Sequence, residues 1–316
     1  MILTISPNAA MDYIYHIDNF KIGSHNRVNN PTVMAGSKGI NCLRALKSLG
    51  AKAETCIAIA GDNGKRILNR LEEEKLKAHY ISISGESRNA ITIMHDNDIQ
   101  TEIVEEGPKI NLEYQTLFFR KIEKTIKESS NLNTITINGS VNSENSLFYL
   151  DLLIHLKSIS DKSLKVLMDI SGVQLSSIIE NDYYCPYFIK PNITEFSELI
   201  GSKLTDKSSV SNALLEFNTQ IPIFMVSCGG DGAIVKYDNS IYDIKIPDIQ
   251  VINPTGAGDS TVAGIAYATD QNYSFVNAMK LGMACGISNT MQKGVGVINN
   301  RDVKKLVNKI TVEKIY

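Results

Sequence analysis

The clearest sign of chemistry in this sequence is a glycine-rich turn that carries one carboxylate. Thr255-Gly256-Ala257-Gly258 lies between an apolar run and a helical run, and Asp259 follows it. Glycines let backbone N–H groups approach an anion, and the positive end of a helix dipole favours one there. A carboxylate would repel a phosphate at that point, so we expect Asp259 to face an acceptor hydroxyl and take its proton. A plain turn with a helix cap is the alternative.

Other polar residues of suitable type precede this turn. Asp12 can accept two hydroxyl hydrogen bonds, and the Arg88 guanidinium can bond two oxygens of one phosphate. Asn192 and Glu195 fall one helical turn apart, which suits metal-bound water because Mg²⁺ keeps much of its hydration shell. A solvated Asp, an exposed Arg and a plain helix start are the alternatives.

A second glycine-rich stretch, Ser227-Cys228-Gly229-Gly230-Asp231-Gly232, follows another apolar run. It permits a ligand to approach closely, and it also fits an ordinary turn between two strands. The dinucleotide fingerprint G-x-G-x-x-G is not met near Asp259, because Thr261 occupies its third glycine position, and no Walker A sequence occurs. A nucleotide-dependent oxidoreductase therefore has little support.

The elements that must position these residues alternate along the chain, β-rich runs with amphipathic helical stretches. This pattern predicts a three-layer α/β fold, a mostly parallel central sheet with helices on both faces. Leucines and isoleucines at helical spacing over 40–49, and a helix-like charge pattern over 66–75, predict crossover helices. The candidate strands are 2–6, 54–60, 134–138, 165–169, 187–190, 222–227 and 233–237, and the C-terminal helices are 258–269, 274–291 and 301–309.

Two stretches, about 11–36 and 88–106, break this alternation because strand-like runs follow each other there without a helix. They predict a small separate β-sheet, a natural lid for chemistry that must exclude water. No repeat, low-complexity tract or Pro/Gly/Ser-rich linker divides the chain, so we expect one domain over 1–316. The open edge of such a lid sheet can pair across a two-fold axis in a homodimer.

Composition narrows the function classes. The chain has 32 Lys and Arg against 34 Asp and Glu, so no overall field favours nucleic acid or an anionic membrane as partner. Its five cysteines are widely spaced and fit a reducing cytoplasm better than a disulfide framework or a metal site. No run reaches the roughly 20 apolar residues that span a bilayer. We expect a cytoplasmic protein.

With these motifs in order, the chain resembles the PfkB carbohydrate kinase family of ribokinase-like fold from residue 1 to about 300. Gly36-Ser37-Lys38-Gly39-Ile40-Asn41 is similar to the first family signature, in which a second glycine is commoner than Ser37. A serine there disfavours a positive φ. Asn138-Gly139-Ser140-Val141-Asn142 lacks the proline that the family often has in that loop. The loops at 227–232 and 255–260 also match.

The resemblance implies a role for each matching residue. Sugar and sugar-phosphate contacts fall on Asp12, Gly36, Lys38, Gly39, Asn41 and Arg88, with Arg27 as a weaker candidate. ATP contacts fall on Lys190, Asn192, Ser227, Gly229, Gly232, Thr255 and Asn289. Glu195 and Asn192 are tied to Mg²⁺, through water. Asp259 is the catalytic base, and the amides of Gly256, Ala257 and Gly258 stabilise the transferring group.

Within the family, the surroundings of Arg88 look like the tagatose-6-phosphate kinase and 1-phosphofructokinase branch. Stretches 86–89, 105–108 and 259–264 look closer to tagatose-6-phosphate kinase, which would convert tagatose 6-phosphate to the 1,6-bisphosphate with ATP. A 1-phosphofructokinase acting on fructose 1-phosphate is the alternative. A sugar-phosphate or nucleotide-binding regulator without catalysis is the alternative of another class, and the intact Asp259 argues against it.

Overall fold

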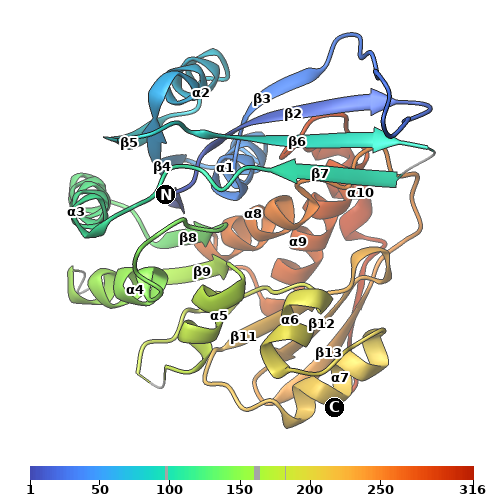
Figure 1. Cartoon of the computed structure of the whole chain (residues 1–316). Helices are drawn as coiled ribbons and strands as arrows, with labels where there is room; N and C mark the ends of the chain where they lie inside the picture. The colour runs from blue at the N-terminus through green and yellow to red at the C-terminus, as the bar shows by residue number, and fades with distance from the viewer. Residues whose placement is uncertain (97–98, 160–163, 182) are drawn as a thin grey trace.

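A large twisted sheet runs through the middle of the protein (Figure 1). The computed structural model describes residues 1–96, 99–159, 164–181 and 183–316. From edge to edge the sheet contains β14 (Thr311–Lys314), β13 (Ser240–Lys245), β12 (Ala233–Tyr237), β11 (Ile223–Ser227), β10 (Phe188–Ile189), β9 (Lys165–Asp169), β8 (Thr134–Asn138), β1 (Ile2–Ser6), β4 (Ala53–Ala60) and β5 (Ala78–Ile83).

Most of this sheet is parallel. From β5 through β4, β1, β8, β9 and β10 to β11, each strand runs parallel to its neighbour, and β12, β13 and β14 follow antiparallel at one end. The predicted strands are therefore confirmed, with ends that shift by at most one residue. The carboxyl ends of the parallel strands meet at one edge, where α/β folds bind ligands.

Helices cover both faces of the sheet, as the alternation predicts. One face carries α1 (Lys38–Ser48), α2 (Gly61–Glu73), α8 (Ala257–Asp270), α9 (Phe275–Thr290) and α10 (Asn300–Val307). The other carries α3 (Leu112–Glu128), α4 (Phe148–Ile159), α5 (Gly172–Ile179), α6 (Ile193–Ile200) and α7 (Lys207–Glu216). Neighbours on β1 divide between the two cores, Ile2 into one and Leu3 into the other, because strand side chains alternate.

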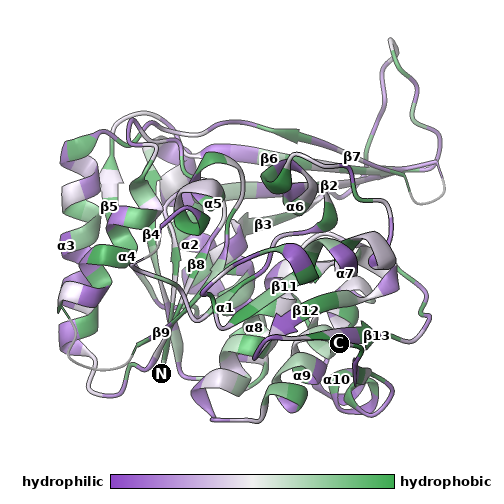
Figure 2. Cartoon of the chain, turned by 90° about the horizontal axis from the view of Figure 1, so that it is seen from below, coloured by the Kyte–Doolittle hydropathy of each residue, from purple (hydrophilic) through white to green (hydrophobic). Residues whose placement is uncertain are grey.

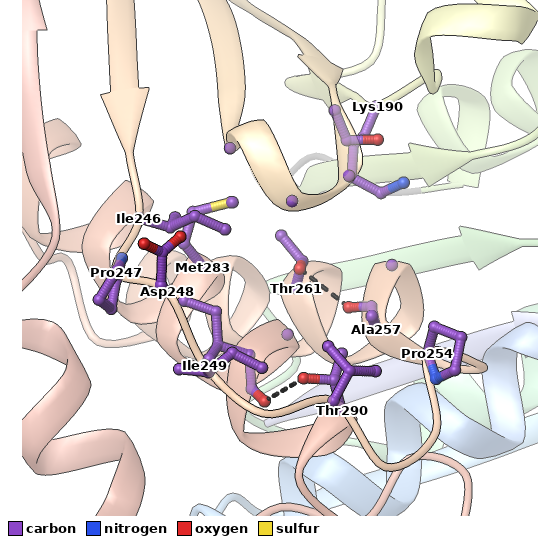
Figure 3. Close-up of a pocket in the computed structure, with 18 residues that line it drawn as sticks. Lys190, Ile246, Pro247, Asp248, Ile249, Pro254, Ala257, Thr261, Met283 and Thr290 are labelled. Carbon is purple, nitrogen blue, oxygen red and sulfur yellow. Dashed lines mark hydrogen bonds between the residues drawn. The ribbon is translucent and has the colours of Figure 1, made fainter. Parts of the chain in front are cut away.

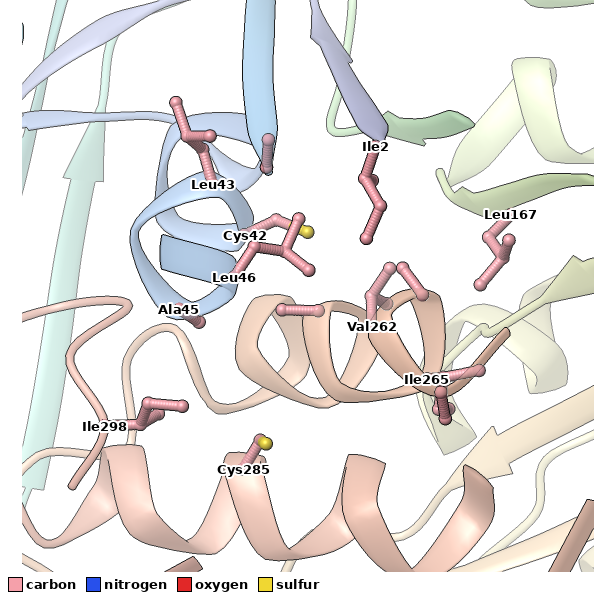
Figure 4. Close-up of a cluster of buried hydrophobic side chains, with 14 of the residues drawn as sticks. Ile2, Cys42, Leu43, Ala45, Leu46, Leu167, Val262, Ile265, Cys285 and Ile298 are labelled. Carbon is pink, nitrogen blue, oxygen red and sulfur yellow. The ribbon is translucent and has the colours of Figure 1, made fainter. Parts of the chain in front are cut away.

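Amphipathic helices seal these cores. Hydrophobic and hydrophilic residues alternate around α3 in Figure 2, and its buried side includes Phe118 and Ile122. Figure 4 shows the opposite core, where Leu46 of α1 and Val262 of α8 pack together beneath β1. This packing keeps α1 and α8 against each other. Among the described helices, none is both long enough and apolar enough to span a lipid bilayer.

A second, four-stranded sheet lies across one side of the large one (Figure 1). Its order is β3 (Thr32–Gly36), β2 (Ala10–Ile17), β6 (Arg88–His95) and β7 (Ile99–Val104). These strands confirm the predicted small sheet, although residues 97–98 of its second segment lie outside the described residues. We call this sheet the lid.

Three strands were not predicted, namely β5, β13 and β14. All of them lie at or near the ends of the large sheet. β14 is short and largely exposed, so its sequence carries no apolar run for a pattern to detect.

Candidate active site

The parallel strands bring polar residues from distant segments to one edge of the large sheet. β9 ends at Asp169, Lys190 follows β10 directly, and β11 ends at Ser227. The first turns of α1 and α8 add Lys38 and Asp259 to this group. Sheet topology therefore assembles the site, since no two of these elements are neighbours in the sequence.

Two cavities share the glycine-rich turn 255–259 as a wall. The first cavity has a volume of about 360 Å³ and is lined by Ala257 and Gly258 of the turn. The second, of about 380 Å³, is lined by Thr255, Gly256 and Asp259. Each is large enough to hold a small ligand or much of one. A turn between two such cavities suits a reaction between two bound ligands.

The first cavity has a polar end and an apolar end. The predicted residues Lys190, Ser227, Gly229 and Gly232 line the polar end. The apolar end was not predicted, and Figure 3 shows part of it, opposite Lys190; it is formed by Ile246, Ile249, Val251, Met283 and Ile287. These residues come from a loop and from α9 and form no motif. A ligand with a flat apolar base and an attached polyanion would match these two ends, the base at the apolar end and the polyanion at the polar end.

Asp169 is a functional candidate that sequence reasoning missed. Its carboxylate is buried, and its Oδ1 lies 3.2 Å from Nζ of Lys38 and 3.4 Å from Nζ of Lys190. Burial alone would raise the pKa of Asp169, but the two ammonium groups hold it below its usual value. Its position at the carboxyl end of a predicted parallel strand was the available signal.

Lys38 and Lys190 place one positive charge at each cavity. Lys38 lines the second cavity and Lys190 the first, where a Cβ on Gly258 would lie only 3.3 Å from its Nζ. The ammonium of Lys190 is therefore beside the backbone of the turn. Two cations flank the place where the cavities approach each other, which favours a negatively charged group in transit.

Asp259 lies in the first turn of α8 and is 7% exposed. Nδ2 of Asn41 donates a hydrogen bond to its Oδ2 at 2.8 Å. Burial raises the pKa of Asp259 to about 6, and the Lys38 ammonium opposes the rise. The carboxylate is then mostly ionised at neutral pH and retains the basicity that a proton acceptor needs.

Asp12 and Arg88 lie at the lid side of the second cavity, on the neighbouring strands β2 and β6. Burial raises the pKa of Asp12 to about 7, while Arg44 and Arg88 oppose the rise. The Nε of Arg88 is buried and has no hydrogen-bond partner among the described residues. A buried guanidinium N–H without a partner requires an acceptor, and a phosphate oxygen is one suitable type of acceptor.

The 36–41 signature forms the wall between the lid and α1. A Cβ on Gly36 would lie 2.0 Å from the Asp12 carboxylate, so only glycine leaves room for that side chain. Ser37 has φ 143° and ψ 158°, in a region that non-glycine residues rarely adopt. The expectation that serine would avoid a positive φ here is therefore wrong. Its Oγ accepts a hydrogen bond from Ile40 N at 3.3 Å and caps α1.

The loop that departs from the family pattern also reaches the second cavity. Gly139 and Ser140 line it beside Lys38. Gly139 has φ 86°, and its carbonyl accepts a hydrogen bond from the hydroxyl of Tyr149 at 2.8 Å. The missing proline thus does not remove the loop from the site.

Asn192 and Glu195 form a capping box at the start of α6. Asn192 Oδ1 accepts from Glu195 N, and Glu195 Oε2 accepts from Asn192 N, each at 2.8 Å. Glu195 also lines the second cavity, whereas Asn192 lines neither cavity. Among the described residues, no cluster of three or more metal-ligating side chains occurs. An ion here would rely on Glu195, Asp169 and ligand phosphates, as hydrated Mg²⁺ commonly does.

Two further candidates lie apart from the cavities. Arg27 is exposed in the loop between β2 and β3 and lines neither cavity. Asn289 is fully buried; its Nδ2 donates to Thr255 O at 2.8 Å and its Oδ1 accepts from Gly296 N at 2.7 Å. Asn289 thus ties the glycine-rich turn to the loop after α9.

A ribokinase-like fold whose two cavities meet at a buried carboxylate and two lysines defines a phosphotransferase. Residues 8–301 match the model of the pfkB family of carbohydrate kinases, and the chain belongs to this family. It is therefore a carbohydrate kinase, as its sequence motifs predict.

Solved structures show the same fold. A Thermotoga maritima protein described as a possible 1-phosphofructokinase is 23% identical, with a TM-score of 0.87 and full coverage of both chains. Escherichia coli phosphofructokinase-2 in complex with substrates and products is 22% identical, with a TM-score of 0.84 over 97% of this chain and 98% of that one. A complex of the same enzyme with potassium is 20% identical, with a TM-score of 0.83 over 97% of this chain and 98% of that one. These similarities confirm the predicted fold.

Proposed function

We propose that the protein transfers the γ-phosphoryl group of ATP to a ketohexose phosphate. The observation that carries this proposal is the turn 255–259, which forms a wall of both cavities and presents Asp259 to the second. ATP would occupy the first cavity, with adenine at the apolar end and its phosphates near Lys190 and the glycines. The acceptor would occupy the second, with a hydroxyl beside Asp259.

Each end of the acceptor has a matching group in the second cavity. Arg88 has a buried, unpartnered Nε and supplies the phosphate site, and Asp12 accepts hydrogen bonds from sugar hydroxyls. Asp259 takes the proton of the attacking hydroxyl, and the N–H groups of 256–258 stabilise charge on the transferring group. Lys38 and Lys190 add positive charge on the two sides.

When bound, Mg²⁺ would screen the negative charge of the ATP phosphates. Glu195 fits the ion because its carboxylate lines the second cavity, and Asp169 adds a buried carboxylate at the end of β9, although it lines neither cavity. Asn192 would contribute to the predicted metal site by positioning Glu195 through the capping box.

Tagatose 6-phosphate is the acceptor that we propose, and the product is tagatose 1,6-bisphosphate. The resemblance of 86–89, 105–108 and 259–264 to tagatose-6-phosphate kinase supports it. Phosphofructokinase-2 from Escherichia coli has been solved with fructose-6-phosphate, a C4 epimer of tagatose 6-phosphate. Fructose 1-phosphate is the second candidate, favoured by the likeness to the Thermotoga maritima protein.

A coupled assay of ADP release tests this proposal. The purified protein with MgATP is offered tagatose 6-phosphate, fructose 6-phosphate and fructose 1-phosphate at equal concentrations. We expect the highest kcat/KM with tagatose 6-phosphate. A preference for fructose 1-phosphate would make the protein a 1-phosphofructokinase, and binding of sugar phosphate without ADP release would make it a regulator.

We also propose that residues 1–316 act as one catalytic domain in the cytoplasm, as a homodimer through the lid. None of the five cysteines forms a disulfide among the described residues, which supports the reducing compartment. β7 is an edge strand of the lid and exposes Ile99 and Ile103, which supports pairing there. Sedimentation of the protein beside its Ile103→Lys variant tests the dimer, since the charge should yield monomers.

A further inference from the structure

Arg44 is a buried cation that the proposed mechanism does not use. It lies on α1, one turn after Asn41, and is 7% exposed. A charge is rarely buried unless it is paired and fully hydrogen-bonded, because desolvation is costly. The neighbours of Arg44 therefore indicate what holds it there.

Each of its five N–H donors has an acceptor. Nε donates to Glu74 Oε2 at 2.5 Å and Nη2 to Glu74 Oε1 at 3.0 Å. Nη2 also donates to Ala35 O at 2.8 Å, and Nη1 donates to Val295 O at 2.8 Å and to Asn41 Oδ1 at 3.1 Å. A planar guanidinium with all donors occupied is held rigidly and cannot be replaced by lysine.

The contact with Asn41 orients that carboxamide. Because arginine offers only donors, the oxygen of Asn41 must face Arg44, and the nitrogen must face away from it. Nδ2 of Asn41 then donates to Asp259 Oδ2 at 2.8 Å, which leaves Oδ1 as the oxygen available to a hydroxyl. A turned carboxamide would place its oxygen against the carboxylate.

The same side chain joins the walls of the second cavity. Ala35 precedes Gly36 on the lid strand β3, and Val295 itself lines the cavity. Arg44 thus connects the lid, α1 and the loop after α9 around Asp259.

We infer that Arg44 is a positioning residue that acts through Asn41, fixing the carboxamide so that one oxygen of Asp259 is held and the other is free for the acceptor hydroxyl. This inference rests on the proposed role of Asp259 as the base. Lys38, Asp169, Lys190 and Asp12 are the other charged groups that influence Asp259, and none of them contacts the Asn41 carboxamide in the hydrogen bonds described.

Arg44→Lys keeps the positive charge and removes the planar guanidinium with its five N–H donors. We expect kcat to fall about ten- to a hundredfold, because small misplacements of a reacting group have effects of this size. In the pH profile of kcat, the acidic limb should move to higher pH by about one unit. Loss of a hydrogen bond to the ionised Asp259 carboxylate raises its pKa. Glu74→Gln is the control, because it weakens the ion pair and leaves the Nη1 contacts intact. It should lower the Tm without moving the limb.

A double-mutant cycle separates positioning from general destabilisation. If Arg44 acts through Asn41, Arg44→Lys should change kcat less than about twofold in an Asn41→Ala background. Independent, multiplicative effects, or an Arg44→Lys variant that changes only the Tm, would overturn the inference.

Asn41→Asp provides the test if Arg44→Lys does not fold. Arg44 would engage one carboxylate oxygen, and the other would face Asp259, so the acidic limb should move upward by a pH unit or more. An unmoved limb would overturn the inference. Retained activity of Asp259→Asn would instead overturn the proposed function, so the two failures are distinguishable.

Discussion

Lys38 and Lys190 contact the same oxygen of Asp169, at 3.2 Å and 3.4 Å, although they come from α1 and from the end of β10. One buried carboxylate thus holds together two cations that serve different cavities. Without it, the ammonium groups would repel each other at the point where we propose that the phosphoryl group is transferred. The shared ion pair keeps both charges close to the turn 255–259 before any phosphate arrives.

Asp169→Asn should destabilise the ligand-free protein by about 3 kcal/mol at pH 7, because removing the charge leaves two cations without their nearest counter-ion. The pKa of Asp169 is held below its ordinary value. The ion pair therefore stabilises the fold above pH 4, and its contribution is lost as the pH falls through the depressed pKa. Urea unfolding of both proteins from pH 2.5 to pH 8 measures this difference on both sides of the titration.

The difference in unfolding free energy between the parent and Asp169→Asn should be nearly constant above pH 5. It should disappear only in acid. MgATP should restore part of the lost stability, because its phosphates replace the missing anion. A variant as stable as the parent at pH 7 would show that Asp169 does not hold the lysines.

Asp259→Asn should reduce kcat by about 10³-fold, in the range general base catalysis supplies, with sugar-phosphate affinity changed less than severalfold. The parent enzyme should gain kcat/KM as the pH rises through about 6, because Asp259 must be ionised to accept a proton. Steady-state kinetics from pH 5 to pH 8 and equilibrium titration of the sugar phosphate measure both effects. Turnover near the parent value would exclude Asp259 as the base.

The sequence alone predicted most of the frame and the turn at its centre. Strand and helix patterns are local properties of the sequence. The strands β1, β8 and β9 and the lid could therefore be predicted directly from it. Arg44 could not be identified, and Asp169 offered only its place at the end of a predicted strand, because their roles depend on strand order and on partners such as Lys190 and Glu74 that are distant in sequence. The residues of the apolar end of the first cavity were not predicted for the same reason.

Arg88→Ala should raise the KM for the sugar phosphate at least about tenfold while changing the KM for ATP less than twofold. The reason is that a charge-assisted pair to one ligand contributes roughly 1.5–3 kcal/mol. Arg66→Ala is a matched control, since Arg66 lies on α2 near the lid, contacts Tyr13 and lines neither cavity. It should alter neither KM. Equal effects of Arg88→Ala on both substrates would place the phosphate elsewhere.

Ser37→Gly should stabilise the protein, although it shortens a side chain at a signature position. Ser37 has φ 143° and ψ 158°, a conformation that costs a non-glycine residue about 1–3 kcal/mol. Glycine removes this strain, and it loses only the cap to Ile40 N and some unfolded-state entropy, together about 1 kcal/mol. We expect a net gain of about 1 kcal/mol in urea unfolding. Ser37→Ala is the control, because it keeps the strain and loses the cap, so it should be the least stable of the three. If the Gly and Ala variants unfold at the same urea concentration, the backbone at residue 37 stores no strain.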